Sequence, residues 1–246
     1  MSGNGNPEPI VVLVHGAFAE SASWNGVIQR LHDRGLAAIA VANPLRSVAT
    51  DAAYLRDVIA SLDRPVILVG HSYGGMVISA AAAGNPAVCA LVYVAAFAPE
   101  TGEDAVQLSG VYPGSTLGDA LVAYPLTEGG VELRIADEKF HQQFCADLDT
   151  GEAALMAATQ RPVTQQALTE GLTISEPGWR GIPSWFVWGE HDLNIPAALV
   201  RFMAERAGAR GTCEIPGASH ALAASQPDVV AGTIFAAVNQ TAPVLR

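Results

Sequence analysis

A serine stands between glycines in the first third of the chain. The segment Gly70-His-Ser72-Tyr-Gly74 follows the apolar run Val66–Val69 and precedes a stretch rich in small residues. A serine on a sharp turn between a strand and a helix needs neighbours without side chains, and the helix N-terminus favours negative charge that develops nearby. The pattern predicts that Ser72 is a nucleophile.

Such a serine needs a base, because a hydroxyl at its ordinary pKa reacts poorly. His220 follows a weak strand in the segment Gly-Ala-Ser-His-Ala-Leu, whose small residues would let the ring reach a neighbouring loop. His15 and His71 adjoin tight turns, so we expect them to serve local geometry. We predict that His220 is the base.

A carboxylate must orient that histidine. Asp192 leaves the apolar run Trp185–Trp188 within Gly-Glu-His-Asp, which would place it at the carboxyl edge of a strand, although it could instead cap the next helix. The rival acids follow the run Val88–Ala96 and would face the same edge: Glu100, Glu103 and Asp104. Glu103 and Asp104 lie in the polar stretch Thr-Gly-Glu-Asp, which by default indicates a solvated turn. We predict that Asp192 is the orienting acid, in the order nucleophile, acid, base.

Two backbone amides are expected to complete the site. The first apolar run ends in Val-His-Gly16-Ala17-Phe18, where glycine permits a turn that could aim an N–H at a substrate oxygen. A tetrahedral oxyanion requires two such donors. Ala17 and Tyr73, the residue after the serine, are the natural pair, although the segment could be an ordinary strand-to-helix turn.

Alternating elements must position these residues. Short apolar runs, typical of buried parallel strands, occur at Ile10–Val14, Ala37–Val41, Val66–Val69, Val88–Ala96 and Trp185–Trp188, with a weak strand near Thr212–Ile215. Helix-period segments separate them, one of them with Thr50 as a candidate N-cap. The alternation predicts a doubly wound, mostly parallel α/β sheet, whose ligand site lies at the carboxyl ends of the strands.

One interval breaks this rhythm. Residues 99–178 are rich in Gly, Pro, Thr and Asp, with helical pieces near 137–148 and 152–159, so we expect an inserted, mainly helical cap. The core would then comprise residues 9–98 and 179–246, preceded by a flexible tail at 1–8. The aromatic residues that we expect to line a substrate pocket, unless those of the cap only pack within it, are Phe18, Tyr112, Tyr124 and Phe144.

Composition excludes other classes of protein. The 246 residues carry a formal net charge of −11, which repels nucleic acids and anionic membrane surfaces. No apolar stretch is long enough to span a bilayer. The three cysteines lack metal-binding spacing, and the first residues lack the pattern of a secretory signal, so we expect a cytoplasmic protein without a bound metal.

These motifs together resemble those of the α/β-hydrolase superfamily from about Pro9 to Val238. The segments VLVHGAF, GHSYGGM, WGEHDLNIP and GASHALAASQP are similar in particular to the small, capped serine esterases that include plant methylesterases and hydroxynitrile lyases. The resemblance implies a Ser72, His220 and Asp192 triad, an oxyanion hole from the Ala17 and Tyr73 amides, and no cofactor.

The expected activity is hydrolysis of a small carboxylic ester or lactone through an acyl-Ser72 intermediate. Hydroxynitrile lyases similar to this chain carry Thr or Asn where Gly16 stands and Lys where Ala221 stands, so the resemblance disfavours cyanide elimination. A small-ligand sensor with slow or no turnover on the same fold is the other alternative.

Overall fold

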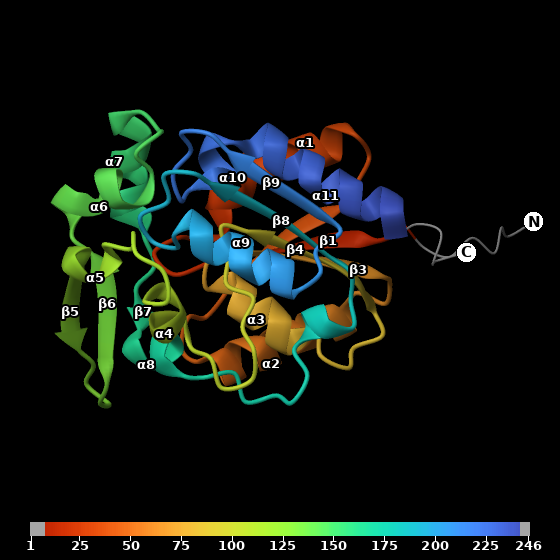
Figure 1. Cartoon of the computed structure of the whole chain (residues 1–246), viewed down its shortest axis with the longest axis horizontal. Helices are drawn as coiled ribbons and strands as arrows, with labels where there is room; N and C mark the ends of the chain where they lie inside the picture. The colour runs from red at the N-terminus through yellow and green to blue at the C-terminus, as the bar shows by residue number, and fades with distance from the viewer. Residues whose placement is uncertain (1–7, 242–246) are drawn as a thin grey trace, which may run out of the picture.

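A computed structural model of the chain describes residues 8–241. Its centre is a six-stranded sheet in which every neighbouring pair is parallel (Figure 1). The strands in spatial order are β2 (Ala38–Val41), β1 (Ile10–Val14), β3 (Val66–His71), β4 (Val88–Val94), β8 (Ser184–Gly189) and β9 (Gly211–Ile215). This order confirms the predicted doubly wound parallel sheet. Of the expected flexible tail, residues 1–7 lie outside the described residues.

Helices cover both faces of this sheet (Figure 1). One face packs against α2 (Val48–Ser61), α3 (Gly74–Ala81) and α9 (Ala197–Arg206) through buried side chains such as Leu55, Met76 and Leu199. The other face packs against α1 (Asn25–Asp33), α10 (Leu222–Ser225) and α11 (Pro227–Thr241). Because both faces are covered, the inner strands β1, β3, β4 and β8 are largely apolar and could be predicted as apolar runs, whereas the edge strand β9 is less buried and more polar.

The start of α2 differs from the expectation. Ser47 is the N-cap, and its hydroxyl oxygen accepts a hydrogen bond from the Thr50 N–H at 3.1 Å. Thr50 therefore lies in the first turn rather than at the cap. Both residues have side chains suited to capping, and only the backbone geometry distinguishes them.

The segment between β4 and β8, which we call the cap, contains both helices and strands. Its helices are α4 (Ala105–Ser109), α5 (Leu117–Ala120), α6 (Asp137–Phe144), α7 (Thr150–Thr159) and α8 (Gln165–Thr169), and the short 3-10 helix η2 (Gly178–Arg180) follows. Its strands are β5 (Leu121–Pro125), β6 (Val131–Ile135) and β7 (Val163–Thr164), which form an antiparallel sheet.

The cap is mainly helical, as expected, but its small sheet was not anticipated from the sequence. Four of the five residues of β5 are exposed, so the strand has no buried face that would create a regular apolar pattern. Side chains of α6, by contrast, join the same hydrophobic cluster as α2, α3 and α9, and they fix the cap to the core.

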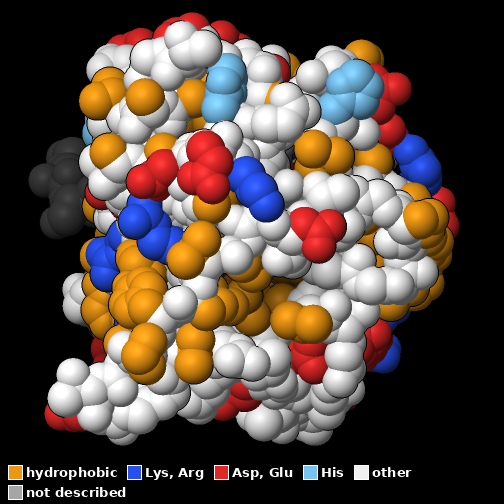
Figure 2. All heavy atoms as spheres, turned by 90° about the vertical axis from the view of Figure 1, so that its left-hand side faces the viewer, with side chains coloured by type: hydrophobic (Ala, Val, Ile, Leu, Met, Phe, Trp, Pro, Cys, Tyr) orange, Lys and Arg blue, Asp and Glu red, His pale blue; other side chains and the backbone are white. Residues whose placement is uncertain are grey.

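One face of the cap carries much exposed apolar surface. Figure 2 views the molecule from the side of β5, β6, α6 and α7, where hydrophobic side chains form groups separated by charged and uncharged polar ones. The large hydrophobic residues of the cap that are exposed are Val106, Val111, Val122, Tyr124 and Leu155.

Within residues 8–241, no helix combines the length and the apolar character that crossing a bilayer requires.

The beginning of the cap is tied to the core by ionic and capping interactions. Arg206 of α9 donates to both carboxylate oxygens of Glu103 at 2.8 Å and to the Ala98 carbonyl at 2.7 Å. Asp104 is only 5% exposed and caps α4, where it accepts a hydrogen bond from the Gln107 N–H at 2.7 Å. Residues 101–102 form an exposed turn, as expected, but the expectation of solvation is wrong for Asp104.

Replacing the α4 cap should destabilise the protein measurably. We expect Asp104→Ala to lower the free energy of unfolding by about 1 kcal/mol, because it leaves a helix N–H without its acceptor. Asp104→Asn retains a capping oxygen and should stay close to the parent protein. Denaturant unfolding of the three proteins checks this, and equal losses in both variants would contradict a capping role.

Candidate active site

Ser72 occupies the tight turn between β3 and α3. Its φ is +55°, a left-handed backbone conformation that is strained for serine. Its N–H donates to the Val94 carbonyl at 3.2 Å, and its own carbonyl accepts from the Gly75 N–H at 2.9 Å. A Cβ on Gly70 would lie 2.7 Å from the Gly74 carbonyl oxygen, so the turn closes only because position 70 has no side chain.

His220 and Asp192 form a buried hydrogen-bonded pair. His220 Nδ1 lies 2.7 Å from Asp192 Oδ2, and the two side chains are 1% and 0% exposed. Since the carboxylate can only accept, Nδ1 carries the proton and Nε2 keeps its lone pair. The pairing gives His220 the tautomer that a general base requires.

The Asp192 carboxylate is itself held by the backbone. Its Oδ1 accepts hydrogen bonds from the N–H groups of Asn194 at 2.7 Å and Ile195 at 2.9 Å. Asp192 therefore closes the loop after β8 rather than capping α9, whose N-cap is Pro196. One oxygen fixes the loop and the other meets the imidazole.

Each of the rival acids is engaged elsewhere. Glu100 pairs with Arg180, Glu103 pairs with Arg206, and Asp104 caps α4. Within residues 8–241, Asp192 is the one carboxylate that hydrogen-bonds to His220. The choice among acids at the same sheet edge thus follows from partners that the linear sequence does not display.

Ala17 and Tyr73 line the same cavity as Ser72. Neither N–H has a hydrogen-bond acceptor among the described residues, whereas the adjacent Phe18 N–H donates to the Arg161 carbonyl at 3.1 Å. Two unpaired amides beside a serine hydroxyl are suited to hold a developing oxyanion.

A buried carboxylate anchors Tyr73 and was not anticipated from the sequence. The Tyr73 hydroxyl donates to Asp51 Oδ2 at 2.9 Å, and Asp51 also accepts from the Arg46 N–H at 3.1 Å. Burial raises the pKa of Asp51, and both side chains are almost fully enclosed. Asp51 and Tyr73 lie far apart in the chain and belong to no common sequence motif, so the sequence did not indicate this contact.

Two further histidines pack around the site in neutral form. The His71 ring lies 4.6 Å from the His220 ring, and its Nε2 is 3.0 Å from the His220 carbonyl oxygen. Burial keeps the pKa of His71 well below its usual value. Burial also lowers the pKa of His15 to about 4, and His15 Nε2 accepts from the Asn43 N–H at 3.1 Å. Both shape the turns that adjoin Ser72.

Ser72 and His220 line a cavity of about 300 Å³ between core and cap. Its lining is mainly apolar and comes largely from α4, α5 and the loops around them; the residues are Ala17, Phe18, Ser72, Tyr73, Phe97, Ala105, Val106, Ser109, Gly110, Ser115, Leu117, Gly118, Leu121, Phe144, Leu168, Asn194, Ile195 and His220. Among residues 8–241, no group of three or more metal-binding side chains lies together.

Two of the four aromatic residues expected in this pocket lie elsewhere. Phe18 and Phe144 line the cavity, and the Phe144 ring meets the His220 ring edge-on at 5.1 Å. Tyr112 instead packs near Phe202 of α9, and the Tyr124 hydroxyl donates to Glu132 on the neighbouring strand. Tyr112 and Tyr124 are thus corrected to cap residues outside the cavity, because their orientation depends on cap strands and loops that the sequence did not reveal.

A mostly parallel sheet with a serine on a sharp turn between a strand and a helix is typical of the α/β hydrolases. The chain matches the model of the alpha/beta hydrolase family over residues 11–233 and belongs to that family.

Similar proteins include both hydrolases and a lyase. The chain is 28% identical over 243 residues to alpha/beta hydrolase nvfD of Aspergillus novofumigatus, covering 91% of this chain and 94% of that protein. It is 28% identical over 238 residues to an alpha-hydroxynitrile lyase of Arabidopsis thaliana, covering 88% and 92% respectively. Its fold resembles that of polyneuridine aldehyde esterase, with a TM-score of 0.79 and 21% identity over 94% of this chain and 99% of that chain.

The neutral, buried His15 should make stability depend on pH. Its pKa rises from about 4 in the folded protein to its ordinary value of 6.5 on unfolding, so the unfolded chain binds more protons between these values. Stability is therefore lost as the pH falls from 6.5 toward 4, by up to about 3 kcal/mol from this residue.

Denaturant unfolding between pH 7 and pH 4 measures this effect. We expect His15→Gln to flatten the pH dependence relative to the parent protein, whereas His32→Gln on the exposed face of α1 should leave it unchanged. A parallel curve for His15→Gln would show that His15 does not carry the effect.

Proposed function

We propose that the protein hydrolyses a small carboxylic ester or lactone through an acyl-Ser72 intermediate. The observation that carries the proposal is the buried Asp192–His220 pair, because His220 lines the same cavity as Ser72. Ala17 and Tyr73, whose amides have no acceptor among the described residues, line it too. Membership of the alpha/beta hydrolase family agrees with it.

In the first half-reaction, His220 Nε2 takes the Ser72 proton while Ser72 Oγ bonds to the ester carbonyl carbon. The carbonyl oxygen becomes an oxyanion that the Ala17 and Tyr73 N–H groups stabilise. When the tetrahedral intermediate collapses, the bond to the alcohol oxygen breaks and the alkoxide takes the proton from His220. The acyl group stays on Ser72.

In the second half-reaction, water loses a proton to His220 Nε2 as its oxygen bonds to the acyl carbon. The second intermediate collapses, the bond to Ser72 Oγ breaks, and the proton returns from His220 to the serine. The Asp192 carboxylate stabilises the imidazolium in both halves without taking its proton.

The similarity to a hydroxynitrile lyase makes cyanohydrin cleavage the second candidate. The structure around Ser72 argues against it. A Cβ on Gly16 would lie 2.6 Å from the Ser72 Cβ, so position 16 has no room for a polar side chain without rearrangement. Ala221 is buried beside His220 and offers no cation for a cyanide leaving group.

Two assays separate the candidates. Esterase activity should appear as release of p-nitrophenol from short p-nitrophenyl esters, whereas lyase activity would appear as aldehyde formed from a cyanohydrin. A pre-steady-state burst with the ester would indicate an acyl-enzyme, and a sensor protein would show neither burst nor steady turnover.

Removing the serine hydroxyl should abolish hydrolysis. We expect Ser72→Ala to lower kcat by roughly 10³-fold or more, because no acyl-enzyme can form. Ser109→Ala is the matched control, since Ser109 lines the same cavity but its hydroxyl donates to its own helix at Ala105. Retention of most activity in folded Ser72→Ala would refute the serine mechanism.

The orienting acid can be tested with isosteric amides. Asp192→Asn should lower kcat by about 10⁴-fold, because an amide no longer holds the required tautomer of His220. Asp104→Asn should remain near the parent rate, since its carboxylate caps α4. Full activity in Asp192→Asn together with loss in Asp104→Asn would reverse the assignment.

A further inference from the structure

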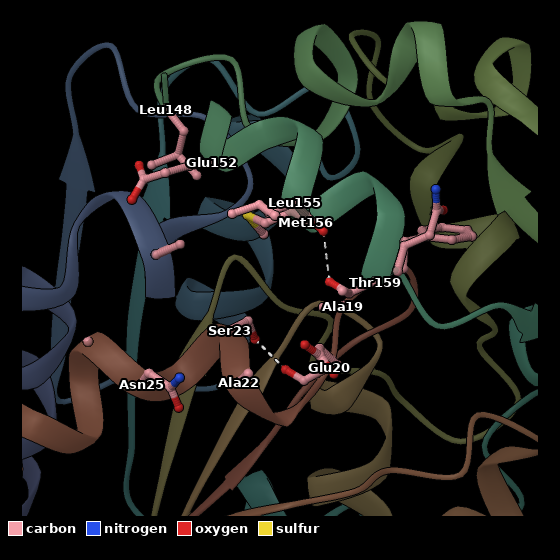
Figure 3. A pocket seen from close by; sticks show the side chains of 14 residues that line it. Ala19, Glu20, Ala22, Ser23, Asn25, Leu148, Glu152, Leu155, Met156 and Thr159 are labelled. Atoms are coloured by element: carbon pink, nitrogen blue, oxygen red, sulfur yellow. Dashed lines mark hydrogen bonds between the residues drawn. The ribbon is translucent and has the colours of Figure 1, made fainter. Parts of the chain in front are cut away.

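A second concave site lies directly beside the catalytic cavity. This groove, of about 490 Å³, runs between α7 of the cap and the 3-10 helix η1 (Ser21–Trp24) of the core. Figure 3 shows Leu155 and Met156 projecting from above and Ala22 and Ser23 lying below. Phe18 lines both the groove and the catalytic cavity, and it is the one residue that the two linings share among residues 8–241.

Phe18 is held in this shared wall by its backbone. Its φ is +60°, a conformation that is costly for a bulky residue and for which glycine would be the usual choice. Its N–H donates to the Arg161 carbonyl at 3.1 Å, which ties the loop after β1 to the cap, and its side chain is 3% exposed. This backbone conformation and the tie to the cap fix the position of the ring between the groove and the catalytic cavity.

We propose that Phe18 limits substrate length, because it closes the catalytic cavity toward this groove. The proposal rests on the esterase function argued above. The wild-type protein then takes compact, mainly apolar esters that fit within about 300 Å³, and longer chains are excluded by the ring. Without the ring, the groove would become a subsite for the far end of a longer acyl chain.

The lining of the groove defines which chain end it would accept. Leu148, Leu155 and Met156 supply apolar surface for methylene groups. Glu20 and Glu152 are the charged residues of the lining, which contains no Lys, Arg or His. An uncharged or cationic chain end would therefore be favoured over a carboxylate.

The decisive measurement is the ratio of kcat/KM for p-nitrophenyl decanoate to that for p-nitrophenyl butanoate. We expect Phe18→Ala to raise this ratio at least tenfold. Several methylene groups of the decanoyl chain gain contacts, and one methylene in an apolar pocket is worth roughly tenfold or more in kcat/KM. The kcat/KM of an ester whose acyl chain has the same length but ends in a carboxylate should increase less than that of an ester whose chain ends in a methyl group. An unchanged ratio in folded Phe18→Ala would overturn the proposal.

Filling the groove tests whether the gain arises there. Ala22 is exposed in η1, so Ala22→Trp can occupy the groove without disturbing the core. Added to Phe18→Ala, it should remove most of the gain with decanoate. Alone in the wild-type protein, Ala22→Trp should change kcat/KM for neither ester, because Phe18 closes the groove. A selective loss of decanoate hydrolysis there would show that the groove is already open to substrate and would contradict the proposal.

Phe97→Ala is the matched control, because Phe97 lines the catalytic cavity and not the groove. If Phe97→Ala raises the ratio of decanoate to butanoate hydrolysis, adding Ala22→Trp should not reduce that increase. If Ala22→Trp reduces the increase equally in Phe97→Ala and in Phe18→Ala, the proposal is contradicted. Should Phe18→Ala fail to fold by circular dichroism, Phe18→Leu shortens the side chain and should give a smaller gain in the same direction. Absence of butanoate turnover in the wild-type protein would instead refute the proposed esterase function.

Discussion

The tight turn at Ser72 is the constraint on which the rest of the site depends. It presses the backbone of β3 and α3 against the ends of β1 and β4, so close that side chains at Gly16, Gly70 or Gly74 would collide with backbone atoms or with Ser72 itself. The strained φ of Ser72 is maintained because hydrogen bonds to β4 and to α3 surround it. Ala17 and Tyr73, which adjoin this turn, line the cavity, and among residues 8–241 their amides have no hydrogen-bond acceptor.

The parallel sheet brings the remaining chemistry to this turn. Loops after β1, β3, β8 and β9 all leave the carboxyl edge, so residues far apart in the chain converge there. Buried hydrogen bonds then determine which neighbours interact: Asp192 divides its oxygens between its own loop and His220, while Asp51 holds the side chain of Tyr73. Neutral His15 and His71 fill the space around the turn without adding charge, because burial keeps both pKa values low.

The cap covers part of the sheet edge and leaves a mainly apolar cavity there. Apolar surroundings strengthen any electrostatic stabilisation by the two amides. Beyond that space, Phe18 separates the reacting groups from a larger acidic and apolar groove beneath α7. The length of substrate that the cavity accepts is therefore limited by Phe18 of the core loop together with the helices of the cap. The residues proposed for catalysis come from the sheet edge.

The sequence by itself determined the sheet, its flanking helices and the residues proposed for catalysis, because strands buried on both faces read as apolar runs and Gly-x-Ser-x-Gly reflects a local steric need. It did not reveal the cap sheet, since the exposed residues of β5 have no regular apolar pattern. Only tertiary structure decided that Ser47 caps α2, that Tyr112 and Tyr124 lie outside the cavity, and that Asp51 meets Tyr73. Each of these depends on which way a side chain points across a contact between distant segments, and spacing along the chain carries no information about that direction.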